Sequence, residues 1–134
     1  MVTMSDWHET ELRVRYSETD AMGLLHHANY INLFEIARTE LFRAQGGDYR
    51  AMEARGLFLV VVEVLCQYKR PARYDDLLNV RARVSKWSAV KLEHEYEVLR
   101  DGQLVAQGSS ILACVDGNGK IQRMTEEVLF PRQT

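Results

Sequence analysis

The chain has 134 residues and a formal net charge of −2, with 46% hydrophobic and 27% charged residues. These values are typical of a soluble globular protein, and the length predicts one domain over residues 1–134. A nucleic-acid-binding domain usually has a strongly basic surface, so this charge does not favour that function. The longest apolar run, residues 57–62, is too short to span a bilayer, and residues 1–7 lack a secretory signal. We therefore expect a cytoplasmic protein.

The two cysteines give no sign of a disulfide or a metal site. Cys66 and Cys114 are far apart in the chain, in apolar runs, and neither has the spacing of a metal-binding motif. Glu18, Asp20 and His27 together could suggest a ligand set, but their spacing also matches no known metal motif. We expect two reduced, buried thiols and no metal or other cofactor.

The first half of the chain predicts a strand followed by two helices. Leu12, Val14 and Tyr16 alternate with arginines, as in a half-buried strand, and residues 17–23 form a turn. From Asn29 the apolar residues recur every three or four positions, which predicts a helix that ends at residues 46–47, a Gly-Gly pair. Asp48 then begins a short second helix as its N-cap.

The second half predicts antiparallel strands. Residues 57–69 are continuously apolar at first, which indicates a central strand covered on both faces. Residues 78–84, 90–98 and 104–115 follow as strands, with a tight hairpin at residues 101–102. A second hairpin at residues 116–119 leads to a short strand over 120–124 and a helical turn at Thr125. The predicted fold is α+β, with one long helix over one sheet, and a single helix covers so little of the sheet that we expect dimerisation through sheet edges.

The segment of residues 16–30 is the candidate reaction site. It places the carboxylate of Asp20 shortly before the start of the long helix, near residues 28–30. A helix N-terminus can stabilise a developing oxyanion while a carboxylate supplies or activates the nucleophile, so this arrangement suits attack on a carbonyl. The structural alternative is that Asp20 only closes an Asx-type turn.

This segment resembles the signature of the hotdog-fold acyl-CoA thioesterases of the 4-hydroxybenzoyl-CoA thioesterase and Tol-Pal-associated type. The matching positions are Tyr16, Thr19, Asp20, Gly23, His27 and Tyr30. The resemblance implies an antiparallel sheet wrapped around a central helix, and a homodimer or homotetramer with the pocket between protomers. It also implies that Asp20 is the nucleophile or general base.

The same resemblance assigns the oxyanion site and an assisting histidine, and the sequence suggests further residues for the acyl pocket and for CoA. Backbone N–H groups at Ala28, Asn29 and Tyr30 would hold the thioester oxygen, and His27 would orient groups or transfer a proton. We expect Val60 and Val61 to contribute to the acyl pocket. Candidates for the CoA phosphates are Arg70, Arg73, Lys86 and Lys91.

Other polar residues near this segment are expected to matter less. The chain departs from the aromatic-CoA branch after Trp87, where Ser88, Ala89 and Val90 stand in place of adjacent basic residues. Glu18 and His26 are expected to be dispensable for the chemistry. Glu35 is expected to be a polar helix residue that faces water or Arg38.

The resulting prediction is an acyl-CoA thioesterase that produces a carboxylic acid and CoA without a cofactor. One alternative is a thioesterase acting on acyl groups carried by an acyl carrier protein. Another is a non-catalytic protein that binds acyl thioesters. A hotdog dehydratase is a further alternative, but the arrangement around Asp20 fits hydrolysis better.

Overall fold

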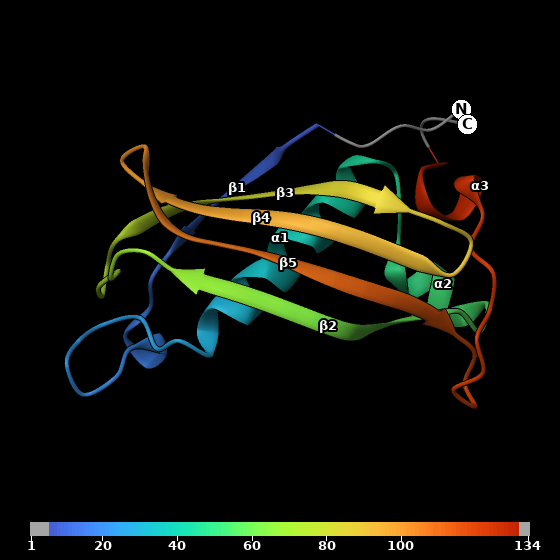
Figure 1. Ribbon diagram of the computed structural model, residues 1–134, viewed down its shortest axis with the longest axis horizontal. Coiled ribbons are helices and arrows are strands. Elements are labelled where there is room, and N and C mark those ends of the chain that lie inside the picture. Colours follow the sequence, from blue (N-terminus) through green and yellow to red (C-terminus); the bar gives the residue numbers. More distant parts are fainter. Residues whose placement is uncertain (1–5, 132–134) are drawn as a thin grey trace.

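The protein forms one antiparallel sheet packed along one long helix, as the computed structural model shows for residues 6–131 (Figure 1). The five strands lie in the order β1-β3-β4-β5-β2. They are β1 (His8–Arg13), β2 (Phe58–Tyr68), β3 (Leu77–Trp87), β4 (Lys91–Arg100) and β5 (Gln103–Val115). The helices are α1 (Asn29–Ala44), α2 (Tyr49–Ala54) and α3 (Glu126–Leu129). The predicted two-layer α+β architecture is confirmed.

Helix α1 forms where the apolar period predicted it. Its buried residues lie on one stripe and include Tyr30, Leu33, Phe34, Ala37 and Leu41. The helix ends before Gly46, which has a φ of 86°, a conformation that favours glycine. Asp48 caps α2 by accepting hydrogen bonds from the backbone N–H groups of Arg50 and Ala51.

Strands β3 and β4 have one apolar and one charged face. Leu78, Val80 and Ala82 of β3 are buried against α1 together with Tyr96 and Val98 of β4. The opposite face carries cross-strand ion pairs, with N–O distances of 2.9 Å for Arg81–Glu97 and 3.3 Å for Arg83–Glu95. This alternation fixes the register of the strands, because a slip of one residue would move the charged set into the core.

Gly108 lets β5 and α1 approach closely. The ring of Phe34 stacks on that of Tyr96, with ring centroids 4.4 Å apart. A Cβ atom on Gly108 would lie 2.6 Å from the Phe34 ring and would also collide with the carbonyl oxygen of Leu65 on β2. The absence of a side chain at Gly108 therefore allows Phe34 to fill the centre of the core.

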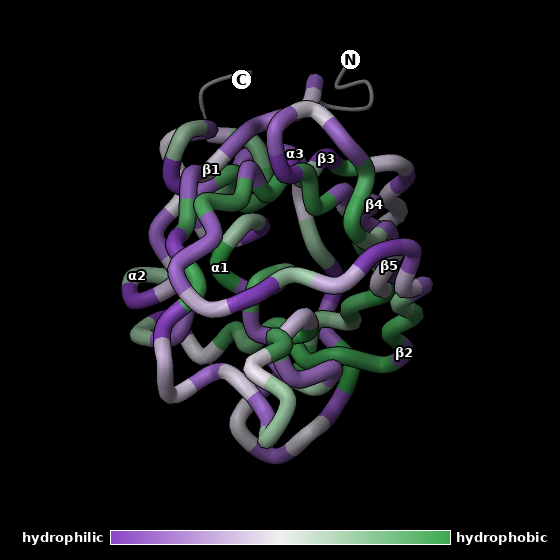
Figure 2. The backbone as a smooth tube through the Cα atoms, turned by 90° about the vertical axis from the view of Figure 1, so that its left-hand side faces the viewer, coloured by the Kyte–Doolittle hydropathy of each residue, from purple (hydrophilic) through white to green (hydrophobic). Residues whose placement is uncertain are grey.

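The prediction that β2 is a central strand is wrong, because β2 is an edge strand that pairs only with β5. Val60, Val61, Val62 and Leu65 are 41%, 48%, 62% and 55% exposed. Figure 2 shows this hydrophobic strand at the margin of the molecule. A valine-rich run indicates that the side chains of a strand favour burial. It does not indicate whether they are buried within the same chain or against another chain.

Two other predicted elements differ from the structure. The first strand ends at Arg13, and Tyr16 begins a 3₁₀ turn over Tyr16–Glu18. Residues 120–124 form no strand and have only an isolated bridge between Val115 and Ile121. The carboxylate of Asp116 accepts the backbone N–H of Lys120 and closes the turn tightly. The helical turn at Thr125 is confirmed as α3.

Candidate active site

The loop between the first 3₁₀ turn and α1 is held in place mainly by backbone hydrogen bonds. The N–H of Asp20 donates to the carbonyl of Leu24 at 2.8 Å, and the N–H of Gly23 donates to the carbonyl of Asp20 at 3.0 Å. Gly23 has a φ of 76°, which explains the glycine at this turn. The N–H of Leu25 donates to the carbonyl of Ala72 at 2.8 Å, so the loop is fixed to the segment before β3.

Asp20 closes its own turn with one carboxylate oxygen. Its Oδ1 accepts the backbone N–H groups of Met22 at 2.9 Å and Leu24 at 3.2 Å. Within residues 6–131, these are the hydrogen bonds of the Asp20 side chain, and the side chain is exposed. The Asx-type turn therefore exists, and it orients the carboxylate while leaving Oδ2 available for chemistry.

Asp20 lies at an open hollow of about 360 Å³ beside the start of α1. The hollow brings together four of the residues selected from the sequence, which are Asp20, His27, Tyr30 and Arg70. The other lining residues are Leu24, Leu25, Tyr68, Lys69 and Pro71. One face of the hollow thus comes from the loop and helix start, and the other from the end of β2.

The backbone N–H groups at the helix start all have acceptors within the chain. The N–H of Ala28 donates to Nδ1 of the His26 ring at 3.1 Å, and the N–H of Asn29 donates to the His26 carbonyl at 2.9 Å. The N–H of Tyr30 donates to the carbonyl of His27 at 3.3 Å. Only the bond from Ala28 ends on a side chain, so it is the one that a rotation of the His26 ring would release.

Tyr68 ties the end of β2 to the start of α1. Its hydroxyl donates to the carbonyl of His27 at 2.9 Å, and its ring meets that of Tyr30 edge-on with centroids 5.1 Å apart. The exposed ring of His27 stacks on that of His26 with centroids 4.2 Å apart. The sequence reasoning missed Tyr68, since no motif marks it and its only signal is its place at the end of the predicted strand.

Glu18 has a structural role at this site. Its carboxylate accepts the backbone N–H of Arg15 at 2.7 Å. Its carbonyl accepts the backbone N–H of His26 and the side-chain amide of Asn29, both at 2.9 Å. Glu18 therefore holds the loop and the helix start together.

Comparison with known proteins decides the family. The family model described as "Thioesterase-like superfamily" matches residues 14–130. The chain belongs to this superfamily. The expected enzyme class, thioester hydrolase, and the hotdog fold are thereby confirmed.

Relatives of this thioesterase cover most of its length. It is 33% identical over 123 residues to the "Acyl-CoA thioesterase YbgC" of Haemophilus influenzae, which is 91% of this chain and 87% of the relative. The solved structure of a DHNA-CoA thioesterase from Staphylococcus aureus matches with a TM-score of 0.85 and 30% identity, covering 95% and 85% of the two chains. A hypothetical protein from Aquifex aeolicus matches with a TM-score of 0.86 and 36% identity, covering 91% and 96%.

The candidate residues for the acyl pocket and the CoA phosphates lie in different parts of this thioesterase. Val60 and Val61 lie on the exposed edge strand, and neither lines the hollow. The side chain of Arg70, within the hollow, donates to the carbonyl of Leu104 at 2.7 Å. Lys86 and Lys91 flank the β3–β4 turn, which lies at the opposite end of β3 from the loop that carries Asp20.

Burial favours the neutral forms of Tyr30, which lines the hollow, and of Cys66, which lies on β2 near Tyr68. Burial, with smaller effects from Cys66 and Tyr68, raises the pKa of Tyr30 to about 12. Burial also raises the pKa of the Cys66 thiol. Both cysteines are free, and Cys114 is buried as expected, whereas Cys66 is only partly buried because it lies on the edge strand β2.

Residues 6–131 show neither a metal-binding cluster nor a membrane-spanning helix. No cluster of three or more His, Cys, Asp or Glu side chains in this range has the arrangement needed to hold a metal ion. No helix in the same range is long and apolar enough to cross a membrane.

Proposed function

We propose that the protein hydrolyses acyl-CoA thioesters to a carboxylic acid and CoA, with Asp20 as the nucleophile or general base. The observation that carries this proposal is the fixed carboxylate of Asp20 in the same hollow as His27 and the start of α1. Membership of the thioesterase-like superfamily supports the reaction class. The relative from Haemophilus influenzae, which is named an acyl-CoA thioesterase, supports CoA as the carrier.

The chemistry needs only groups that the chain supplies. As a general base, Asp20 removes a proton from water, and the resulting hydroxide attacks the thioester carbonyl. The C–S bond then breaks and the CoA thiolate receives the proton. As a nucleophile, the Asp20 carboxylate instead attacks the carbonyl and expels CoA as its thiolate, which leaves a mixed anhydride. Water then hydrolyses the anhydride, which releases the acid, regenerates the carboxylate and supplies the proton that the CoA thiolate takes up. No metal or cofactor takes part in either route.

The oxyanion of either route is assigned to the start of α1. The N–H of Ala28, now bonded to the His26 ring, is the donor that the thioester oxygen takes over when this ring turns away. Asn29 and Tyr30 add the positive end of the helix dipole, and His27 orients the leaving group. Loss of one such donor costs about 10²–10³ in rate in a well-studied hydrolase.

The proposed assembly is a homodimer or homotetramer in the cytoplasm, with β2 as an interface. Exposed valines and Leu65 on β2 would pair with the same strand of a second copy and continue the sheet. Arg70 lies in the hollow and is the first candidate to bind a CoA phosphate. Further candidates to bind a CoA phosphate are Arg73, Lys86 and Lys91. In the proposed dimer, the two lysines would bind the CoA held in the partner's hollow. The finer assignment to the 4-hydroxybenzoyl-CoA and Tol-Pal-associated type is part of the same proposal.

The decisive experiment compares acyl-CoA hydrolysis by the wild type and by Asp20→Asn. Asn keeps an oxygen that can accept the N–H groups of Met22 and Leu24, so the turn is retained. We expect kcat to fall by about 10²–10⁴, the usual contribution of a positioned acid or base. Asp75→Asn is the matched control, since Asp75 is exposed, lies outside the hollow and has a φ of 72°, which Asn tolerates. Equal rates for wild type and Asp20→Asn would refute the role of Asp20.

An acyl carrier protein is the alternative carrier of the acyl group. The observation in its favour is the basic pair Lys69 and Arg70 at the hollow, which suits an acidic partner. Rates measured with the same acyl group on CoA and on acyl carrier protein separate the two carriers. Binding of acyl-CoA and of the acylated carrier protein without hydrolysis of either would instead identify a non-catalytic acyl-thioester binding protein.

A further inference from the structure

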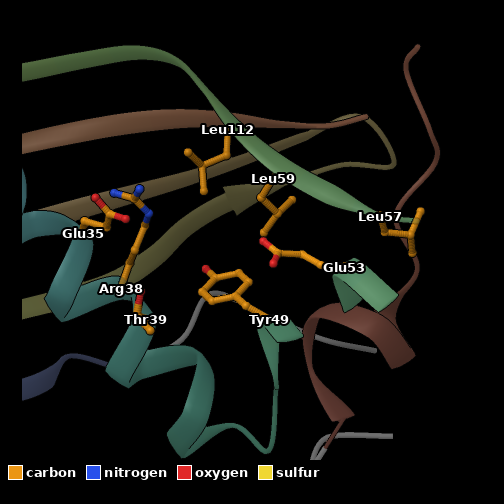
Figure 3. A pocket seen from close by; sticks show the side chains of 8 residues that line it. All are labelled: Glu35, Arg38, Thr39, Tyr49, Glu53, Leu57, Leu59 and Leu112. Atoms are coloured by element: carbon orange, nitrogen blue, oxygen red, sulfur yellow. The ribbon is translucent and has the colours of Figure 1, made fainter. Parts of the chain in front are cut away.

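A second pocket of about 140 Å³ lies between α1, α2 and the sheet, away from the Asp20 hollow (Figure 3). It is lined by Glu35, Arg38, Thr39, Tyr49, Glu53, Leu57, Leu59 and Leu112. Figure 3 shows Glu35 and Arg38 extending from α1, with the Tyr49 hydroxyl turned toward their side of the pocket. Arg38, Tyr49 and Leu59 also line a narrow cleft that reaches His94.

Polar groups lie in this pocket, at the half-buried Tyr49, and in the narrow cleft behind it, at His94. His94 is only 3% exposed, and its Nδ1 has no hydrogen-bond partner within residues 6–131. Burial, and to a smaller extent Arg38, lowers the pKa of His94 to about 3, so its ring is neutral. Burial also raises the pKa of Tyr49 to about 12, so its hydroxyl keeps its proton. In the pocket itself, Glu35, Arg38 and Tyr49 offer an acceptor and donors to a polar ligand group.

The pocket lies at the opposite end of β2 from the Asp20 hollow. Leu57 and Leu59, at the start of β2, line the pocket, while Tyr68, the last residue of β2, lines the hollow. In the dimer proposed above, antiparallel pairing of the two β2 strands about their middle places the start of one strand beside the end of the other. The pocket of each protomer then adjoins the hollow of its partner.

We propose that this pocket receives the far end of the acyl group held at the partner's Asp20, and that it selects short acyl chains bearing a hydroxyl group. This proposal rests on the proposed thioesterase function and on the β2 dimer. At about 140 Å³ the pocket is much smaller than the Asp20 hollow of about 360 Å³, so it suits the end of a short acyl chain. An unsubstituted alkyl chain would contact Leu57, Leu59 and Leu112, but it would offer no hydrogen-bond partner to Glu35, Arg38 or Tyr49.

The charges in the pocket favour a hydroxyl over a carboxylate on the acyl group. Two carboxylates, Glu35 and Glu53, and one guanidinium, Arg38, line the pocket, so it has no excess of positive charge to bind an anion. A hydroxyl group can donate to a carboxylate and accept from Arg38 or Tyr49 at the same time. Tyr49 and Arg38 are therefore the specificity residues of this pocket.

The first test measures kcat/KM for matched acyl-CoA pairs of four and six carbons, with and without a terminal hydroxyl, and for dodecanoyl-CoA. We expect the hydroxylated substrates to be preferred by about tenfold, the effect of one satisfied polar contact. Tyr49→Phe removes only a hydroxyl and should lower this preference by about three- to tenfold. Tyr74→Phe removes an equivalent hydroxyl from a residue outside both cavities and should change nothing. Equal use of both members of each pair, or an unchanged preference in Tyr49→Phe, overturns the proposal.

The second test asks which protomer supplies the pocket. A heterodimer is purified with two affinity tags from one chain carrying Asp20→Asn and another carrying Tyr49→Phe. Its only intact Asp20 then faces the wild-type pocket of the other chain, so the preference for hydroxylated substrates should return to the wild-type value. A preference that remains as low as in the Tyr49→Phe homodimer would show that each chain uses its own pocket, which contradicts the proposal. Full activity of the Asp20→Asn homodimer would instead refute the proposed function, so the two failures are distinguishable.

Discussion

The two edges of the sheet have opposite surfaces. β1 presents charged residues, with Glu9, Glu11 and Arg13 exposed along six residues. β2 presents valines and Leu65, which are 38–62% exposed over the middle of the strand. Charged side chains on an edge strand oppose pairing with another chain, whereas an exposed apolar edge favours it. The difference is consistent with the proposed assembly, in which β1 terminates the sheet and a second copy continues it at β2.

The largest expected effect comes from placing charge on β2. Val62→Lys combined with Leu65→Lys adds two positive charges at the two most exposed of these positions and leaves the buried core unchanged. We expect the dissociation constant of the dimer to rise at least about 100-fold, or about 2.7 kcal/mol. Sedimentation equilibrium measures this directly. A dimer of unchanged affinity would show that β2 is not the interface.

A substantial loss of stability is expected behind the β2 edge. Gly108→Ala places a methyl group against the Phe34 ring and the backbone of Leu65, so helix α1 or β2 must move. We expect the free energy of unfolding to fall by about 1–3 kcal/mol, as for other overpacked cores. Urea denaturation measures it, and Gly117→Ala is the control, since a Cβ there meets only Phe58 at 4.0 Å. A urea midpoint of Gly108→Ala as high as that of Gly117→Ala would contradict the close packing of residue 108 against Phe34 and Leu65.

A smaller, pH-dependent effect is expected where the loop before β3 meets the β1 side of the sheet. Partial burial acts to raise the pKa of Asp76, but the backbone N–H of Arg73 and the Arg100 guanidinium outweigh it and hold this pKa below its ordinary value. The carboxylate therefore stabilises the fold above its unfolded pKa, and this contribution is lost as the pH falls through the lowered folded value.

Asp76→Asn should accordingly lower the free energy of unfolding by about 0.5–1 kcal/mol at pH 7, in the range of a partly exposed ion pair. The difference from wild type should disappear in acid, below the folded pKa. Thermal unfolding followed by circular dichroism across this pH range is the measurement. A difference that grows as the pH falls would reverse the inferred sign.

The smallest expected effect is that of a charge change on β1. Glu11→Lys replaces an exposed side chain that has no ion pair within residues 6–131. We expect a change of no more than about 0.5 kcal/mol in stability and no change in oligomer mass. This variant is the matched control for the lysines placed on β2. Dissociation of the dimer by Glu11→Lys would contradict the inference that β2, and not β1, forms the interface.

Local features of the fold could be predicted from the sequence. The period of the apolar residues predicted α1, and Asp48 predicted the cap of α2, because both depend on residues within a few positions. Asp101 and Gly102 adopt positive φ values of 50° and 77° in the predicted hairpin. The segment of residues 16–30 also brought Asp20, His27 and Tyr30 to one hollow, because one short loop positions all three.

Features that depend on distant parts of the chain could not be predicted. The edge position of β2 follows from its pairing with β5, which begins 35 residues after β2 ends. The contact of Tyr68 with His27 and the position of His94 beneath Arg38 also join separate elements. No periodic pattern or local motif encodes such contacts. The catalytic and CoA-binding roles of the candidate residues remain predictions that the proposed variants test.

The hydrogen bond from Tyr68 to the carbonyl of His27 joins the proposed interface to the proposed site. Tyr68 ends β2, at which the proposed second copy binds, and His27 begins the turn into α1 beside Asp20. Pairing that fixes β2 in the proposed dimer would therefore also fix the loop that carries Asp20. We then expect activity per chain to decline when the enzyme is diluted below its dimer dissociation constant.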